Sequence, residues 1–360
     1  MRAALAGLIA GAVLLRLAVY AALAVPHGGL VEAMCRFDCG WYERIALAGY
    51  GADADWPPNG SLPHWAFFPL YPMLLRLGVA VSGLGARLVG IGLSSLLLAG
   101  FMAAGVAYLR RTRGAQAAPE RFVVLVAVVP CGLFFSAVYT EALFACLATL
   151  ALLGLAYARP GAGAVAAALT SATRPTGVLL APVFAVRGLL ALRREGATAL
   201  LPAAIAPLGL VGYMAAQWIA VGDPLAFSHV QALWNREWLG PQAFLWDGLA
   251  AWDWAALASL DASRSFLAAW ALLGLAAALW LALRRRWAEA WLLAGCVLLP
   301  ASTGLDSLAR FVACNPVFLF AVHDVLARLD RRVAWAALVG LGAAGLVPVL
   351  GWMLDRPMVF

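Results

Sequence analysis

Residues 88–109 read LVGIGLSSLLLAGFMAAGVAYL. No charged side chain interrupts this stretch, and its length is close to the ~20 apolar residues that a helix needs to cross a bilayer. The rest of the chain has the same character: 64% of its 360 residues are hydrophobic, 12% are charged, and its mean hydropathy is +0.89. An ordinary globular domain is about half apolar and a quarter charged. The composition therefore predicts an all-α polytopic membrane protein.

Similar apolar stretches recur along the chain and predict about 11 transmembrane helices. Their approximate ranges are 4–25, 88–109, 121–138, 141–158, 161–174, 176–192, 199–220, 266–283, 288–304, 308–327 and 333–354. The first has the charged start of a signal peptide but carries Arg16 and lacks a clear cleavage site, so we expect an uncleaved helix. Residues 66–85 are apolar but contain Pro69, Pro72 and Arg76. We expect this segment to form an interfacial or re-entrant helix at the outer face.

Arginine clusters predict the orientation of the chain. All 25 basic residues are arginine, and together with the 18 acidic residues they give a net charge of +7. Clusters at 110–121, 193–194, 284–286 and 328–332 fall on one side of the predicted spans when the N-terminus is inside. The positive-inside rule makes this the cytoplasmic side. The basic charge therefore reflects topology in the cell (cytoplasmic) membrane, and we expect no nucleic-acid partner.

Two long loops are predicted on the extracytoplasmic side, over 26–65 and 222–264. Loops of this length are often functional. Both are rich in aromatic residues, many of which an interfacial aromatic belt would explain. No internal repeat or linker divides the chain, so 1–360 is expected to form a single membrane-embedded domain.

The first loop contains Asp38 between two cysteines, Cys35 and Cys39. A carboxylate at the edge of a bilayer is costly and is more often functional than one on a soluble surface. In an oxidising compartment the two cysteines could form a disulfide. Two free thiols remain an equal alternative, because pairing cannot be read from sequence.

Unusual polar residues gather at the predicted outer face. They are Asp38, His64, Glu141, Arg174, Asp223, His229, Gln231, Asp306 and Arg310. These residues are distant in sequence but are expected at one membrane depth. A single site built from loops and helix ends would produce this pattern, whereas a transporter more naturally places polar groups near the midplane.

Several short blocks, taken together, resemble the PIG-V-type mannosyltransferases of the GT-C glycosyltransferase superfamily. The blocks are FDCGWY at 37–42 with IA at 45–46 and GY at 49–50, AFFPLYP at 66–72, SAVYTEALF at 136–144, TRPTG at 173–177, DP at 223–224 with Gln231 and Trp234, and SLARF at 307–311. They occur in the family's order and extend over most of the chain. Phe37 departs from the tryptophan that is usual in the family, which we interpret as a conservative packing change.

The resemblance implies a GT-C-type fold and an inverting transfer of a hexose, with mannose implied by the family alone. The donor would be a polyprenyl-phosphate sugar and the acceptor an extracytoplasmic lipid or glycan. An alcohol needs a base to become a good nucleophile, and the family implies Asp38 for this role. Arginine binds phosphate through charge-assisted hydrogen bonds. We therefore expect the donor phosphate at Arg174 and Arg310, with a hydrogen bond from His64.

Seven further residues are expected to line the donor or acceptor site. They are Trp41, Tyr42, Tyr139, Glu141, His229, Gln231 and Trp234.

Structural interpretations compete with these roles. Asp38 could form a salt bridge within its loop to Arg36 or Arg44. Arg174 could extend to the interface from its position before a proline. Arg310 could pair with Asp306 one helical turn away. Glu141 could interact favourably with the dipole at the start of its helix, which we favour over catalysis for this residue.

Asp53 and Asp55 form an Asp-x-Asp sequence of the kind that binds divalent metals. A lipid monophosphate has no diphosphate for a metal to bridge, and the neighbouring Gly and Pro residues favour a turn. We therefore expect no cofactor and consider a metal the weaker alternative. A GT-C enzyme with another sugar, a lipid or lipid-linked sugar translocator, and a non-catalytic subunit remain alternative functions.

Overall fold

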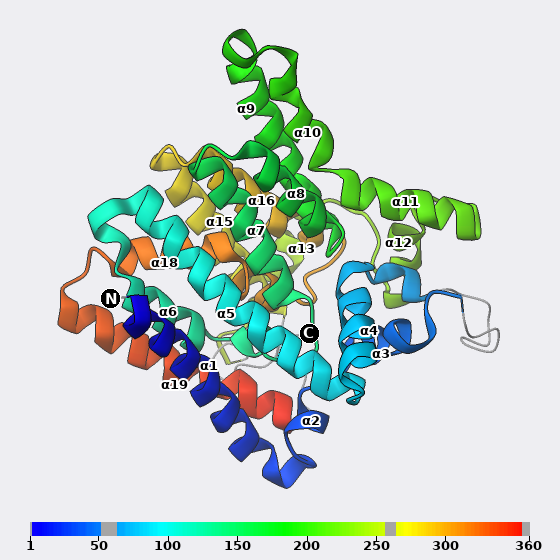
Figure 1. Ribbon diagram of the computed structural model, residues 1–360. Coiled ribbons are helices and arrows are strands. Elements are labelled where there is room, and N and C mark those ends of the chain that lie inside the picture. The colour runs from blue at the N-terminus through cyan, green and yellow to red at the C-terminus, as the bar shows by residue number, and fades with distance from the viewer. Residues whose placement is uncertain (1, 52–62, 256–263, 355–360) are drawn as a thin grey trace.

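The computed structural model describes residues 2–51, 63–255 and 264–354. Every regular element in these ranges is a helix, so the all-α prediction is confirmed for them. Figure 1 shows the helices crossing one another around a common core, with α9 (Leu180–Glu195) and α10 (Leu201–Ile205) projecting together from one end.

Five helical segments in the described part of the chain are long and apolar enough to cross a membrane. One of them, Ala3–His27, overlaps α1 (Arg2–Ala24), and three coincide with α5 (Ala86–Arg113), α15 (Arg264–Leu283) and α19 (Arg331–Met353). The fifth, Pro175–Ile205, includes α9 and α10. Their length and composition indicate an integral membrane protein.

The other apolar helices are too short to cross a bilayer alone, since each has 10–17 residues. They are α4 (Leu70–Ser82), α7 (Glu141–Ala156), α11 (Leu208–Val221), α16 (Trp287–Ala301) and α18 (Pro316–Leu326). At 1.5 Å per residue, 17 residues extend only about 26 Å, whereas the hydrocarbon core is about 30 Å thick. The count of 11 spans, and the path of residues 66–85 relative to the membrane, therefore stay predictions.

Prolines explain why predicted spans are interrupted. The stretch 121–138 begins as α6 (Pro119–Val128), which ends two residues before Pro130. The stretch 308–327 is divided into α17 (Leu308–Ala313) and α18, because Pro316 cannot donate the hydrogen bond that would continue the first helix. Broken helices at membrane depth are acceptable where protein or a water-filled cavity covers their backbone.

Shorter helices complete the structure. They are α2 (Leu30–Ala33), α3 (Cys39–Ala48), α8 (Pro160–Ser171), α12 (Ala226–His229) and α13 (Pro241–Ala250), together with the 3₁₀ helices Val25–His27, Pro63–Ala66, Gly114–Ala117, Gly132–Phe135, Pro175–Leu179, Gly196–Leu200 and Val230–Trp234. Those in the two expected outer loops carry several of the predicted site residues.

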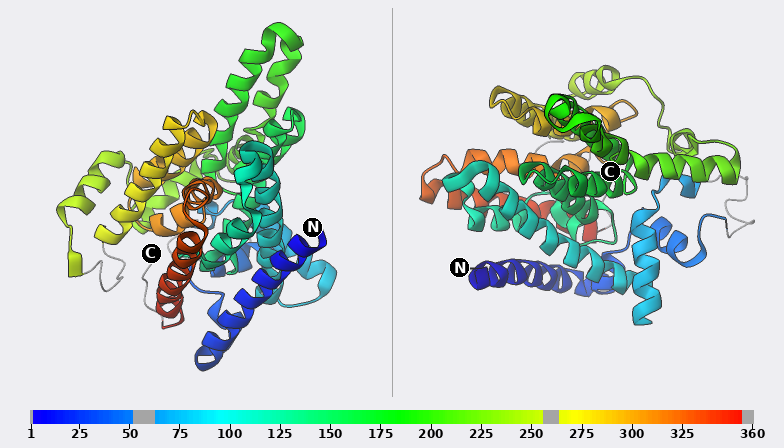
Figure 2. Two further views of the ribbon diagram at one scale, coloured as in Figure 1. Left: turned by 90° about the vertical axis from the view of Figure 1, so that its left-hand side faces the viewer. Right: turned by 45° about the horizontal axis from the view of Figure 1, so that its top comes forward.

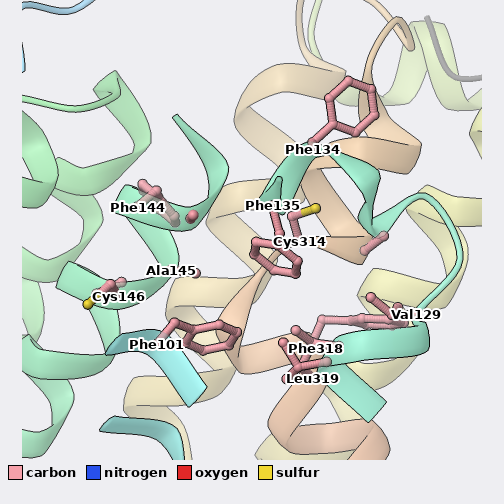
Figure 3. Packing of buried hydrophobic residues seen from close by; sticks show 14 of the residues in the cluster. Phe101, Val129, Phe134, Phe135, Phe144, Ala145, Cys146, Cys314, Phe318 and Leu319 are labelled. Carbon is pink, nitrogen blue, oxygen red and sulfur yellow. The ribbon is translucent and has the colours of Figure 1, made fainter. Parts of the chain in front are cut away.

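The core lies where α7 packs against both α5 and α8 and where α18 meets α5 and α7, while α15 packs on α16. The first and last helices, α1 and α19, both pack against α6. Figure 2 shows these helices, blue and red, in two further orientations. Phe101 on α5 and Phe135 in the 3₁₀ turn after α6 are fully buried, with ring centroids 5.6 Å apart (Figure 3). This packing fixes the broken segment beside the continuous helices.

Arg16 occupies the break after α6. From α1 it donates to Ser136 Oγ at 3.1 Å and to the backbone carbonyls of Ala127 and Gly132. The Ala127 carbonyl lies in the last turn of α6, where carbonyls lack partners within the helix. A buried arginine therefore replaces the hydrogen bonds that the interruption removes.

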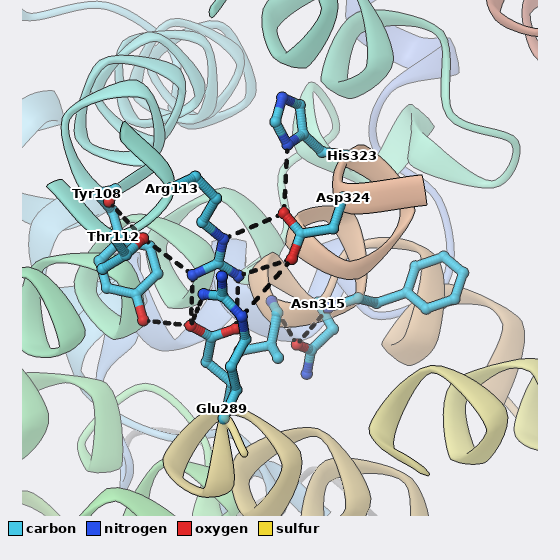
Figure 4. A network of polar contacts seen from close by, with 10 residues as sticks. Tyr108, Thr112, Arg113, Glu289, Asn315, His323 and Asp324 are labelled. Atoms are coloured by element: carbon cyan, nitrogen blue, oxygen red, sulfur yellow. Dashed lines mark hydrogen bonds and ion pairs between the residues drawn. The ribbon is translucent and has the colours of Figure 1, made fainter. Parts of the chain in front are cut away.

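A second buried polar network joins α5, α16 and α18 at the end of α5 opposite the first loop (Figure 4). Arg113 donates to both Glu289 oxygens at 2.7 and 2.8 Å, and to Asp324 at 3.1 Å. Tyr108 donates to Glu289 at 2.6 Å. The Arg113 side chain is 1% exposed, so this network cross-links three helices inside the protein.

Candidate functional site

Asp38 lies in a tight turn between α2 and α3. The disulfide Cys35–Cys39 closes this turn, which decides between the two alternatives for these cysteines in favour of pairing. Phe37 adopts a left-handed backbone conformation with φ of 49°, which a non-glycine residue rarely takes. Its ring compensates by packing on Trp352 of α19, with centroids 5.5 Å apart. The turn is thus held at both its ends and its apex.

Tyr139 fixes the backbone of the same turn. Its hydroxyl donates to the carbonyl of Arg36 at 2.8 Å and accepts from the backbone N–H of Asp38 at 3.2 Å. Nearby, Trp352 Nε1 donates to the Ala33 carbonyl at 2.6 Å. These contacts fix the backbone from which the Asp38 side chain reaches the cavity described below.

The Asp38 carboxylate begins a chain of alternating charges. Arg310 Nη1 lies 2.9 Å from Asp38 Oδ2, and Arg310 Nε lies 3.3 Å from Glu141 Oε1. The same Glu141 oxygen also accepts from Arg174 Nη2, while Arg174 Nε donates to Thr140 Oγ1 at 2.7 Å. Arg310 comes from α17, Glu141 begins α7, and Arg174 lies between α8 and the next 3₁₀ turn. The chain therefore brings together four distant parts of the sequence.

Exposure is lowest in the middle of this chain of charges and rises toward both ends. The Glu141 side chain is 0% exposed, Arg310 is 6% exposed, Arg174 is 17% exposed and Asp38 is 31% exposed. Asp38 is therefore the more accessible carboxylate. Its Oδ2 accepts from Arg310, and no hydrogen bond occupies Oδ1 among the described residues. This oxygen is available to accept a proton or a hydrogen bond.

The residues of this chain line a cavity of about 860 Å³. Such a volume falls within the usual range for small-molecule and cofactor sites. The charged residues among the described lining are Asp38, Glu141, Arg174, Arg236, Asp306 and Arg310. Asp306 shares the cavity, but in the described part of the chain the ion pairs of Arg310 are with Asp38 and Glu141, and the alternative pair with Asp306 is not formed.

Aromatic side chains form another wall of the cavity. Trp41 stacks on Phe67 with centroids 5.7 Å apart, and Trp234 meets both rings edge-on at 6.4 and 6.2 Å. Tyr42 lies edge-on to Phe67 at 5.2 Å. The two expected outer loops thus contribute to one surface, because Trp41 belongs to the first and Trp234 to the second.

Most of the predicted site residues line the cavity, but some do not. Trp41, Tyr42, Glu141, Gln231 and Trp234 line the cavity with Asp38, Arg174 and Arg310. Tyr139 is not part of the lining but supports the Asp38 turn from behind.

Two predicted histidines lie elsewhere. His64 Nε2 is 2.7 Å from the Tyr50 carbonyl, in an aromatic cluster with Trp65. His229 pairs with Asp223 at 2.7 Å and its side chain is 64% exposed. This hydrogen bond holds the pKa of Asp223 below its ordinary value. Neither histidine lines the cavity.

Asp53 and Asp55 lie outside the described residues. Within the described ranges, no group of three or more His, Cys, Asp or Glu side chains is placed to hold a metal ion.

Among the charged residues of the described lining, Arg236 is the one that the sequence did not single out. It lies in the second predicted outer loop, two residues after Trp234. Its only sequence signal is a cation among aromatic residues in a long loop. That signal does not show that the loop folds back toward Asp38.

No protein-family model and no curated protein sequence matches this chain.

Proposed function

We propose that this protein is an integral-membrane inverting glycosyltransferase, with a polyprenyl-phosphate hexose as donor and an extracytoplasmic lipid or glycan as acceptor. The observation that carries the proposal is the Asp38 carboxylate, held by Arg310 and open to a cavity with an aromatic wall. The GT-C fold, the sugar mannose and the extracytoplasmic location rest on the sequence resemblance and on the distribution of arginines.

Asp38 serves as the general base in this mechanism. Its Oδ1 accepts the proton of an acceptor hydroxyl while the hydroxyl oxygen attacks the anomeric carbon. The bond between that carbon and the phosphate oxygen breaks, and the lipid phosphate leaves on the opposite face of the sugar. One carboxylate is sufficient, because phosphate is already an acceptable leaving group.

Arg310 orients Asp38, although an ion pair also makes a carboxylate a weaker base. Here the guanidinium is shared between two carboxylates, since Arg310 contacts Asp38 and Glu141 together. Glu141 is in turn shared with Arg174. The two arginines and two carboxylates are therefore electrically balanced as a set.

The leaving phosphate develops negative charge, and preorganised donors stabilise such charge strongly where water is excluded. Arg174 and Arg310 line the cavity and supply guanidinium groups for this purpose. Arg174 uses Nε and Nη2 within the protein, while its Nη1 makes no hydrogen bond among the described residues. The aromatic wall supplies faces on which a sugar ring can pack.

The test uses purified protein in liposomes with radiolabelled polyprenyl-phosphate mannose and candidate acceptor lipids. The proposal predicts a new glycosidic bond whose anomeric configuration is opposite to that of the donor. Movement of intact donor between leaflets, without a glycosidic product, would identify a translocator. Retention of configuration would exclude the single-displacement mechanism.

A further inference from the structure

Arg236 enters the cavity from the second predicted outer loop. The 3₁₀ turn Val230–Trp234 is followed by Asn235, which ends the turn in the left-handed conformation with φ of 53°. The backbone N–H of Arg236 then donates to the Gln231 carbonyl at 3.2 Å. This closed turn directs a partly buried Arg236 side chain to the cavity that Asp38 and Arg310 also line.

Arg236 differs from the other two cavity arginines in its partners. Arg174 and Arg310 each contact a carboxylate within hydrogen-bond or ion-pair distance. The Arg236 guanidinium makes no hydrogen bond within the described chain, and no described carboxylate oxygen lies within 4.0 Å of it. Asp306 and Asp38 influence it only from farther away.

The electrostatic environment of Arg236 is unfavourable for its own charge. Burial lowers the pKa of its guanidinium, and the positive charge of Arg310 acts in the same direction. A guanidinium nevertheless remains protonated in proteins. The cavity therefore contains a cation without a contacting counter-charge, and an anionic ligand would relieve both the desolvation and the repulsion.

We propose that Arg236 is the residue that holds a phosphate group of the substrate in this cavity. Arg174 and Arg310 are already paired with Glu141 and Asp38, so they can stabilise the departing charge while Arg236 fixes the position of the phosphate. The identification of the phosphate as part of a lipid substrate rests on the proposed function. A planar guanidinium donates two parallel hydrogen bonds to phosphate, which suits a site where the ligand must be oriented as well as bound.

Two sources could supply this phosphate, namely the lipid phosphate of the donor and a phosphodiester in a lipid acceptor. Both offer the same chemistry to Arg236. Either phosphate could reach this cavity. Its lining includes both Asp38, where the acceptor hydroxyl would react, and Arg174, which would lie beside the leaving group of the donor. Binding measurements with separate probes can distinguish the sources.

The test is direct binding of sugar-free polyprenyl monophosphate to the full-length protein in neutral nanodiscs, followed by tryptophan fluorescence. The neutral polyprenol of the same length is the control ligand. We expect the wild type to bind the phosphate more tightly than the alcohol, and Arg236→Gln to lose about 10- to 100-fold in phosphate affinity with no change for the alcohol. Arg236→Lys should recover part of this loss.

Arg76→Gln is the matched control variant, because Arg76 is exposed on α4 and does not line this cavity. It should bind both ligands as the wild type does. Nanodiscs that contain phosphatidylinositol form a second arm. A loss confined to phosphatidylinositol in Arg236→Gln would assign the phosphate to the acceptor, and a loss confined to polyprenyl monophosphate would assign it to the donor.

Equal phosphate affinity of wild type and Arg236→Gln in both arms, with unchanged thermal melting, would overturn the proposal. So would a wild type that fails to distinguish phosphate from alcohol in both arms. Neither arm measures sugar transfer. A failure of the glycosyltransferase proposal would therefore appear as missing product with this binding intact, and the two failures can be told apart.

Discussion

Arg310 Nη1 lies 2.9 Å from Asp38 Oδ2, although the two residues are 272 positions apart in the sequence. The contact joins the disulfide-closed turn of the first loop to α17. Arg310 is also surrounded by aromatic rings, with Tyr139, Phe134 and Phe311 centroids 4.9 to 5.2 Å from its guanidinium carbon. The orientation of Asp38 thus depends on a residue whose own position is fixed by packing.

Two replacements of Arg310 should distinguish its role in orienting Asp38 from the effect of its positive charge alone. Arg310→Gln leaves the buried Glu141 with one cationic partner, and breaking a buried pair costs about 3–5 kcal/mol of folding stability. Arg310→Lys keeps the charge but cannot reach both carboxylates with a planar group. We expect lower stability and no transfer for Gln, and partial stability with reduced transfer for Lys. Denaturation in detergent and a transfer assay measure the two effects, and equal transfer by Lys and wild type would contradict the orienting role.

The Arg113 network should affect stability without affecting the site. Arg113→Met leaves Glu289 and Asp324 without their main partner and should cost about 3–5 kcal/mol. Arg110→Met is the control, because Arg110 is exposed on the same helix. Thermal melting checks the difference. Ligand binding to folded Arg113→Met should equal that of the wild type, and a changed affinity would show coupling between the two ends of α5.

The disulfide should matter more for activity than for folding. A five-residue loop contributes only about 2 kcal/mol through loop entropy. Its position around Asp38 makes it important for the orientation of the base. We expect the double variant Cys35→Ser with Cys39→Ser to stay folded and to lose most transfer activity. Dithiothreitol should reduce the activity of the wild type to the same level and leave the double variant unchanged. An active double variant would show that packing of Phe37 and Tyr139 is sufficient.

Trp234 should contribute to substrate binding through its ring. Its side chain meets Trp41 and Phe67 at the cavity, and an aromatic contact contributes about 1 kcal/mol beyond its buried area. Trp234→Ala should therefore raise KM several-fold or more, with a smaller change in kcat. Trp246→Ala is the control, because Trp246 is 71% exposed and does not line the cavity. Equal kinetics of both variants would assign Trp234 to the interfacial aromatic belt.

The sequence supports a prediction of helical membrane character, because apolar composition and the lengths of residues 88–109 and 333–354 are local properties. It does not predict where the shorter helices break. Pro130 and Pro316 interrupt apolar stretches that hydropathy alone reads as continuous. Whether the freed backbone groups find partners depends on distant residues such as Arg16.

The candidate site, like the fold, could be predicted from the sequence only in part. Block resemblance and the expected membrane depth place Asp38, Arg174 and Arg310 on one side, and the structure brings them to one cavity. His64 and His229 shared the expected depth but contact local partners, Tyr50 and Asp223.

Membrane depth constrains one coordinate only, so residues at the same depth can lie at different lateral positions. Arg236 could not be predicted because its contact with the cavity depends on how its loop folds, which the sequence of the loop does not show.

The most direct test of the account is a transfer measurement on Asp38→Asn, which preserves the size of the side chain and removes its basicity. Asp223→Asn is the control, because Asp223 is an acid of the second predicted outer loop outside the cavity. With polyprenyl-phosphate mannose and acceptor in excess, we predict at least a 100-fold loss of transfer in Asp38→Asn, with donor affinity retained and Asp223→Asn unaffected. Transfer by Asp38→Asn at the wild-type rate would contradict the central claim and make Asp38 a structural partner of Arg310.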